Sequence, residues 1–154
     1  MAYVFEEFIR NFYKLELESN YKVKRENIEW QLIPENEKAK NFLPKMETDI
    51  SIESEKHKYI IDTKYYQSTL QKHTRYDAEK IHSNNLYQLF AYLKNVEDRS
   101  DLDRKCIGML LYPTIDEDYS LDYRHNNQRV LIRTINLNEH WKNISLKLKS
   151  LVSI

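Results

Sequence analysis

The sequence predicts an α/β domain in which a central mixed β-sheet is flanked by α-helices. Apolar residues recur at helical spacing near both ends and in the middle of the chain, and runs of β-branched and aromatic residues separate these segments. The predicted order is α, β, β, β, α, β, β, α, which favours helices packed on a sheet. At 154 residues we expect one domain, residues 1–154, with its own core. This pattern is compatible with several α/β folds.

Composition excludes several classes of function. Lys plus Arg equals Asp plus Glu, 24 each, so no overall basic field attracts nucleic acid and any attraction for phosphate must be local. The single cysteine, Cys106, excludes an internal disulfide and favours a reducing cytoplasm. One glycine excludes glycine-rich phosphate loops. No apolar run approaches the roughly 18 residues of a membrane span, so we expect no membrane association.

Three segments have helical periodicity. The first, residues 3–17, has an apolar stripe formed by Val4, Phe5, Phe8, Ile9, Phe12 and Leu15. The second follows Ser83 as N-cap, and its predicted inward residues are Leu86, Leu89, Phe90 and Leu93. The third follows Asn138 as N-cap, and its predicted inward residues are Trp141, Ile144, Leu148 and Leu151.

The remaining strands are predicted from short apolar runs. Residues 21–25 and 28–33 indicate a short hairpin with a Glu-Asn turn. Residues 106–113 form a continuous apolar run, typical of a central strand buried on both faces. Residues 130–135 predict a further strand, and the polar residues 114–129 before it predict a long surface loop.

The centre of the chain predicts an antiparallel hairpin. Residues 46–52 and 59–66 alternate like strands, and the charged segment 54–58 lies between them as a turn. If the hairpin is centred between Glu55 and Lys56, one face carries an apolar set suited to a core. That set is Ile50, Ile52, Tyr59 and Ile61.

The other face of this hairpin carries two acids and a lysine. In this register Asp49 lies across from Asp62, with Cβ atoms roughly 5 Å apart, and Lys64 shares their face. Two carboxylates this close repel each other unless one takes a proton or a cation neutralises them, and Mg²⁺ is the simplest oxygen-bound cation. The alternative is an exposed face whose ion pair contributes about 0–1 kcal/mol.

These residues also resemble a known signature. Asp49 followed by Asp62-Thr63-Lys64 is similar to the Asp…(Asp/Glu)-X-Lys motif of the PD-(D/E)XK nuclease superfamily, and the flanking text resembles the nuclease domain of the McrC family. The resemblance implies the PD-(D/E)XK fold and a Mg²⁺ ion, for which Mn²⁺ can substitute, on Asp49, Asp62 and the Thr63 backbone carbonyl. It implies that Lys64 positions the attacking water and stabilises the transition state.

Two helical patterns extend the resemblance. Phe-Glu at Glu6 resembles the first helix of McrC-like nucleases, where the glutamate lies near the metal. Gln88 and Tyr92 resemble the Gln-X-X-X-Tyr helix of McrC and RecB-like nucleases, which implies that Gln88 supports catalysis and that Tyr92 packs or contacts substrate. The basic segment up to residue 82 predicts DNA phosphate contacts from Lys72, Arg75 and Lys80, with a solvated loop as the alternative.

The function that the resemblance implies is DNA cleavage in a modification-dependent (5-methylcytosine) restriction system. It implies an McrB-like AAA+ GTPase as partner and a dimer if both DNA strands are cut. McrC proteins carry an N-terminal region that engages the GTPase, and because Met1 precedes the nuclease helix we expect that region to be absent here. The alternatives are a RecB-like DNA-processing exonuclease and a non-catalytic DNA- or protein-binding module.

Overall fold

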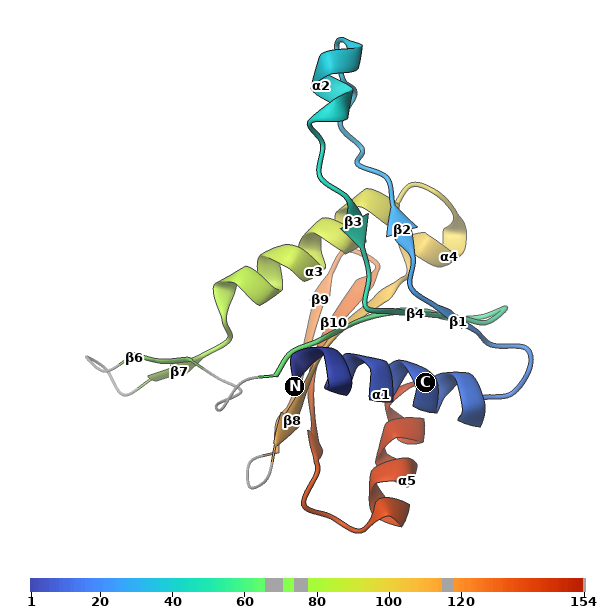
Figure 1. Cartoon of the computed structure of the whole chain (residues 1–154), viewed down its shortest axis with the longest axis vertical. Helices are drawn as coiled ribbons and strands as arrows, with labels where there is room; N and C mark the ends of the chain where they lie inside the picture. Colours follow the sequence, from blue (N-terminus) through green and yellow to red (C-terminus); the bar gives the residue numbers. More distant parts are fainter. Residues whose placement is uncertain (66–70, 74–77, 115–117, 154) are drawn as a thin grey trace.

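The molecule is an α/β structure with a mixed, six-stranded sheet at its centre (Figure 1). The computed structural model describes residues 1–65, 71–73, 78–114 and 118–153, with only the backbone for 71–73 and 78–79. The strand order is β1-β4-β5-β8-β10-β9, with bounds Lys22–Lys24, Ile50–Glu53, Lys58–Thr63, Ile107–Thr114, Gln128–Asn136 and Ser120–His125. β8 is parallel to β5 and to β10, and the other pairs are antiparallel. The predicted fold class, a mixed sheet flanked by helices, is therefore confirmed.

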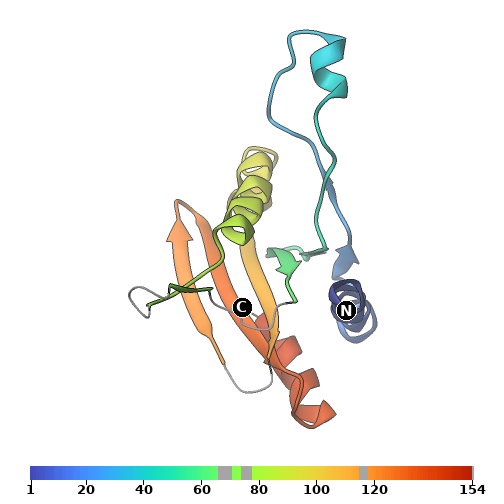
Figure 2. The same ribbon diagram turned by 60° about the vertical axis from the view of Figure 1, so that its left-hand side comes forward.

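Helices cover both faces of the sheet (Figures 1 and 2). Helices α1 (Ala2–Glu16) and α5 (Trp141–Leu151) contribute to one apolar cluster, and α3 (Ser83–Val96) contributes to a second cluster on the opposite face. Successive residues of β5 divide between the two clusters because side chains alternate along a strand: Tyr59 and Ile61 join the first, and Ile60 joins the second.

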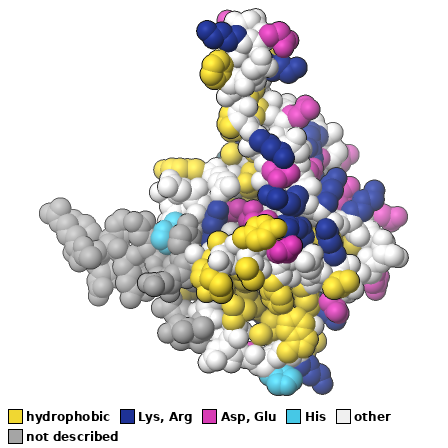
Figure 3. All heavy atoms as spheres, viewed as in Figure 1, with side chains coloured by type: hydrophobic (Ala, Val, Ile, Leu, Met, Phe, Trp, Pro, Cys, Tyr) yellow, Lys and Arg dark blue, Asp and Glu magenta, His cyan; other side chains and the backbone are white. Residues whose placement is uncertain are grey.

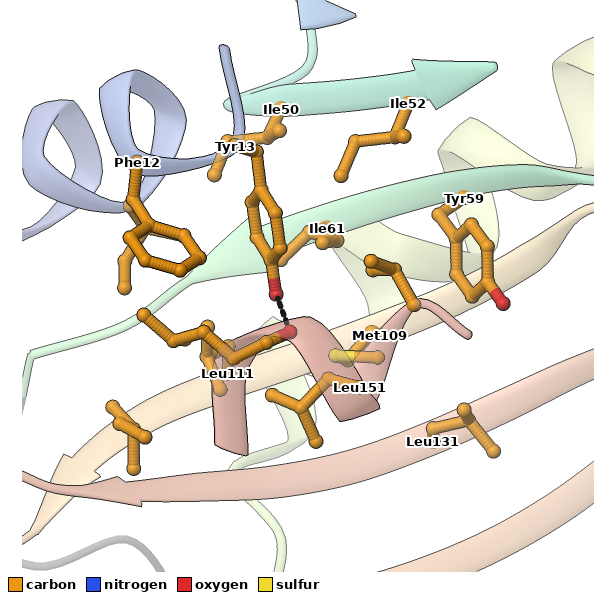
Figure 4. Close-up of a cluster of buried hydrophobic side chains, with 14 of the residues drawn as sticks. Phe12, Tyr13, Ile50, Ile52, Tyr59, Ile61, Met109, Leu111, Leu131 and Leu151 are labelled. Carbon is orange, nitrogen blue, oxygen red and sulfur yellow. Dashed lines mark hydrogen bonds between the residues drawn. The ribbon is translucent and has the colours of Figure 1, made fainter. Parts of the chain in front are cut away.

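The first cluster fixes α1 and α5 to the sheet (Figure 4). The Tyr13 hydroxyl, fully buried, donates a hydrogen bond of 2.8 Å to the Leu148 carbonyl oxygen, and burial raises the pKa of this phenol. Phe5, Ile9 and Phe12 are buried as predicted, but Val4 and Leu15 are exposed, Leu15 at 82%. The buried face of α1 is therefore rotated toward Tyr13, which can be buried because its hydroxyl has a hydrogen-bond partner.

The second cluster holds α3 close to β8. Leu89 and Leu93 are buried as predicted, whereas Phe90 is 40% exposed and Tyr92 is buried in its place. Gly108, the only glycine in the sequence, faces this helix: a Cβ there would lie 2.8 Å from Leu93 Cδ1 and 3.1 Å from Leu89 Cδ1. The missing side chain therefore lets the helix approach the sheet. The N-cap of α3 is His82, one residue before the predicted Ser83.

The central hairpin has the predicted register. β4 and β5 pair with Ile50 opposite Ile61, and the predicted apolar set lies in the first cluster. The predicted first strand is nevertheless too long, because β3 (Met46–Glu47) belongs to a different, two-stranded sheet and the chain bends at Asp49. Asp49 thus lies at the junction between two sheets.

The predicted hairpin of residues 21–25 and 28–33 is wrong. β1 pairs with β4, and β2 (Asn27–Ile28) pairs with β3, because the buried Glu26 between them directs the chain away from a turn. Residues 29–45 form an arm that rises from the body, with the short helix α2 (Glu37–Asn41) at its end (Figure 1). Its tip exposes apolar side chains, Ile33 at 94% (Figure 3).

A buried ion cluster explains Glu26. Lys58, predicted in the turn, is instead a buried strand residue whose Nζ lies 3.0 Å from Glu26 Oε1 and 2.7 Å from Asp103 Oδ1. Arg99 also contacts both acids, and Ser51 donates to Glu26. Hydrogen bonds from Arg99 and Lys58 outweigh burial and lower the pKa of Glu26 to about 2. The cluster joins α4 (Asp101–Arg104) to the sheet.

The C-terminal part completes the sheet. β8 and β10 occupy the two predicted strands. The predicted loop 114–129 is wrong in part, because β9 pairs with β10 as an edge strand through a tight turn at Asn126, whose φ is 53°. The N-cap of α5 is His140, whose Nδ1 accepts from the Lys142 amide, rather than Asn138. β6 (Gln71–His73) and β7 (Ala78–Lys80) form a separate pair. Among the described helices, none has the length and apolarity that crossing a membrane requires.

Candidate active site

Asp49 and Asp62 meet where the central hairpin joins the arm. Asp62 lies on β5 next to Ile60 and Ile61 and is 0% exposed. Asp49 precedes β4, and its Oδ2 accepts hydrogen bonds from the Thr63 amide at 2.9 Å and the Thr63 hydroxyl at 3.0 Å. These two bonds fix the Asp49 carboxylate against the strand that carries Asp62.

Asp62 is a buried acid whose negative charge few neighbouring groups offset. Its Oδ2 lies 2.9 Å from Lys64 Nζ, but neither oxygen receives a hydrogen bond of normal geometry from the part of the chain that the structure describes. Burial, followed by the negative charge of Asp49, raises the pKa of Asp62 to about 7, while Lys64 opposes this rise. Such a group requires either a proton or a cation near neutral pH.

Lys64 is held by a relay of hydrogen bonds that ends at the arm. Its Nζ donates to Gln88 Oε1 at 2.7 Å, and Gln88 Nε2 donates to the Tyr92 hydroxyl at 2.8 Å. Tyr92 in turn donates to the Glu47 carbonyl oxygen on β3 at 3.0 Å. Because Gln88 and Tyr92 are one turn apart on α3, the helix sets the position of the lysine amine next to Asp62.

A second chain of contacts holds the bend at Asp49. Arg10, buried on α1, donates from Nη1 to Glu6 Oε1 at 2.7 Å and to the Asp49 carbonyl oxygen at 3.1 Å. Arg25 lies 3.8 Å from Glu6 and 3.0 Å from Glu47. Glu6 is therefore joined through Arg10 to the backbone of Asp49, and its predicted place near a metal ion stays a prediction.

The donor set fits a hard divalent cation. Among the described residues no three His, Cys, Asp or Glu side chains come together as a metal site; the acids that act on each other here are Asp49 and Asp62. Mg²⁺ typically takes one or two carboxylates and completes its shell with water and substrate oxygens. The oxygens of Asp62 without hydrogen bonds are the observation that supports such an ion.

Comparison with known proteins adds to this geometry. The family model described as "McrBC 5-methylcytosine restriction system component" matches residues 1–113. The chain belongs to this McrBC family. A curated relative, the "Type IV methyl-directed restriction enzyme EcoKMcrBC" of Escherichia coli (strain K12), is 33% identical over 141 residues. That alignment covers 92% of this chain and 39% of the relative. The McrC-type resemblance predicted from the motifs is thus confirmed.

Three of the predicted DNA contacts of this McrBC family member lie on described elements. Lys80 is exposed at the end of β7, and Lys72 lies on the paired strand β6. Arg75 lies outside the described residues. Tyr92 is 3% exposed, and both hydrogen bonds of its hydroxyl are internal, so the contacts described here suit packing and positioning.

Sequence reasoning missed two charged residues of the site. Arg10 follows Glu6 by four residues on the buried side of α1, and an arginine inside an otherwise apolar stripe was the available signal. Arg25 forms ion pairs with Glu6 and Glu47 that depend on the path of the arm. That path was not predictable from the local pattern.

Proposed function

We propose that this protein is a Mg²⁺-dependent DNA endonuclease with the PD-(D/E)XK fold, which hydrolyses phosphodiester bonds. The observation that carries the proposal is the pair Asp49 and Asp62, with Asp62 buried and the Lys64 amine 2.9 Å from it. A structural ion pair would not need a second acid held against the first by the Thr63 amide and hydroxyl. Membership of the McrBC family supports the same conclusion.

Each residue has a defined part in this reaction. Asp49, Asp62 and the Thr63 carbonyl oxygen would hold Mg²⁺, or Mn²⁺ in its place, and the ion would polarise the scissile phosphate. Lys64 orients the attacking water and donates to the phosphate oxygens, where negative charge develops. Gln88 fixes the lysine amine, and Glu6 fixes Arg10 and thereby the Asp49 bend.

The proposed biological setting is a modification-dependent restriction system. The relative in Escherichia coli is named a methyl-directed restriction enzyme, and the family description names 5-methylcytosine. We infer that DNA is the substrate, that an McrB-like AAA+ GTPase is the partner, and that two copies cooperate when both strands are cut. Because this chain spans 39% of that relative, these partners are part of the proposal.

A nicking assay tests the site. Supercoiled plasmid is incubated with the protein in Mg²⁺ or in EDTA, beside Asp62→Ala and Lys64→Ala, with the McrB-like partner and GTP included in a parallel series. We expect Mg²⁺-dependent nicking that falls by at least about 10²-fold in both variants, the order of loss when one charge-stabilising group is removed.

Matched variants separate chemistry from folding. Asp98→Ala and Lys142→Ala remove exposed side chains of the same types at a distance from the site, and both should cleave like the parent protein. Metal-dependent cleavage that persists in Asp62→Ala and Lys64→Ala would refute the site assignment. Cleavage unaffected by EDTA would refute the metal requirement.

A further inference from the structure

A groove opens directly beside the candidate active site, between the base of the arm and α3. Its volume is ≈ 480 Å³, within the roughly 300–1,000 Å³ typical of ligand sites. The residues that line it include Trp30, Lys45, Met46, Gln88, Ala91 and Tyr92. Gln88 is shared with the candidate site because its amide accepts the hydrogen bond from Lys64. A ligand in this groove would therefore lie next to the proposed position of the scissile phosphate.

The groove continues along α3 past Trp30. A second hollow of ≈ 400 Å³ shares Trp30 and Ala91 with the first, and its lining includes Tyr87, Phe90 and His125. Tyr87 is 70% exposed, and Phe90, which is partly exposed, makes an edge contact with His125 at 5.6 Å between ring centroids. The linings of the two hollows thus include the rings of Trp30, Tyr87 and Phe90.

Trp30 is held in place at the centre of this path. Its indole Nε1 donates to the Pro44 carbonyl oxygen at 2.7 Å across the arm, and the next amide, Gln31, donates to Asn95 Oδ1 on α3 at 2.6 Å. The ring nitrogen is thereby satisfied, and the partly exposed ring needs no further polar partner. A fixed aromatic ring loses little entropy when a flat ligand stacks on it.

Lysine and arginine side chains lie at the mouth of the groove, each paired with an acid. Glu47, which also lines the groove, is paired with Lys45 at 3.3 Å and with Arg25 at 3.0 Å, and Arg25 lies 3.8 Å from Glu6. Figure 3 shows Lys and Arg side chains interspersed with Asp and Glu side chains where the arm joins the body. Lys94 lines the second hollow and is paired with Glu97. Successive aromatic rings combined with local cations are characteristic of surfaces that bind unpaired nucleic acid, in which bases stack and phosphates meet lysine or arginine.

We propose that this groove, defined by Trp30, Lys45 and the exposed rings of α3, binds unpaired nucleotides of the DNA strand that leads into the active site, with one base stacked on Trp30. The inference rests on the proposed function for its substrate. Beyond that function, it implies that the bases next to the cleaved bond are no longer stacked within the duplex. The binding itself requires neither the metal ion nor cleavage.

Tryptophan fluorescence tests the groove in EDTA, where no cleavage occurs. The chain has two tryptophans, so Trp141→Phe leaves Trp30 as the only reporter and Trp30→Phe leaves Trp141. A short single-stranded oligothymidylate should quench emission in Trp141→Phe and leave Trp30→Phe unquenched. A blunt duplex of mixed sequence, whose bases are stacked on one another, should quench Trp30 weakly.

Affinity measurements add a second readout. Trp30→Ala should weaken binding of fluorescein-labelled oligothymidylate by about tenfold or more, the order expected for one lost base stack, and Trp30→Phe should recover part of it. Lys45→Ala should weaken binding and reduce its dependence on salt by about one charge. Leu146→Ala, an exposed apolar residue on α5, is the matched control and should bind like the parent protein.

The outcomes test binding in the groove separately from the proposed endonuclease function. Unquenched Trp30, or equal affinity of Trp30→Ala and the parent protein, would overturn the groove even if nicking depends on Mg²⁺ and Asp62. Quenching and weakened binding would uphold it even if Asp62→Ala cleaves normally, in which case the endonuclease proposal fails separately. Tighter binding of duplex than of single strands would also overturn it.

Discussion

Replacing Asp62 by Asn should stabilise the metal-free protein. The pKa of Asp62 is raised from its ordinary value of 3.8 to about 7, so folding opposes ionisation of this acid. Stability is therefore full below the unfolded pKa, falls as pH rises from about 4 to 7, and stays reduced above 7. At about 1.4 kcal/mol per pH unit, the ionised carboxylate lowers the free energy of unfolding by roughly 4 kcal/mol.

The assay is urea unfolding in EDTA at two pH values. Asn keeps the shape of Asp62 but carries no charge, so Asp62→Asn should be more stable than the parent protein by roughly 2–4 kcal/mol near pH 8 and by about 1 kcal/mol or less near pH 4. Asp98→Asn, an exposed acid changed in the same way, should show no such gain. Added Mg²⁺ should stabilise the parent protein near pH 8 and leave Asp62→Asn unchanged.

Two results would refute this reasoning. If Asp62→Asn is no more stable than the parent protein near pH 8, then neither burial nor Asp49 disfavours the Asp62 carboxylate and the site has no need of a cation. If the gain is the same at both pH values, it does not arise from ionisation of Asp62. Because both proteins share every other titratable group, the difference between them isolates this carboxyl group.

Further predictions concern residues that support the site. Glu26→Gln should lower the free energy of unfolding by about 3–5 kcal/mol near neutral pH, because Lys58 loses a buried partner, and urea denaturation measures this loss. In the parent protein the stabilisation by ionised Glu26 should persist above pH 4.5 and disappear as pH falls toward 2. Arg10→Met should lower kcat for plasmid nicking while the fold is kept, because the Asp49 carbonyl loses its donor. Loss of cleavage that is fully explained by the fraction of unfolded protein in an unfolding assay would argue for a purely structural role. Gly108→Val should cost about 1–3 kcal/mol by overpacking against Leu93, visible in thermal unfolding, and Gly108→Ala should cost less.

The sequence predicted the elements whose evidence is local. The register of the central hairpin followed from alternation of apolar residues around a polar turn, because a shift by one residue would expose Ile50 and Ile61. Asp49 and Asp62 therefore came together as expected. The strand at residues 106–113 was equally clear, since a run buried on both faces has no polar alternates.

Other features depend on distant partners that a local pattern does not contain. From the local pattern Lys58 is predicted in a turn, but it is buried because it forms ion pairs with Glu26 and Asp103. Phe90 resembles a core residue, but α3 turns its Tyr92 inward because that hydroxyl reaches the Glu47 carbonyl oxygen. The edge strand β9 has exposed, polar alternates, so only its pairing with β10 distinguishes it from a loop.

Asp49 occupies the single bend through which the chain passes from the arm into the main sheet. On one side, Thr48 follows β3 and binds the Glu26 segment through its amide and hydroxyl; on the other, Ile50 begins β4. Further contacts join the arm and its base to α3, from Gln31 to Asn95 and from Glu47 to Tyr92. Because the Asp49 carboxylate accepts two hydrogen bonds from Thr63, any molecule seated on the arm that shifted this carboxylate would have to break both bonds to the strand that carries Asp62.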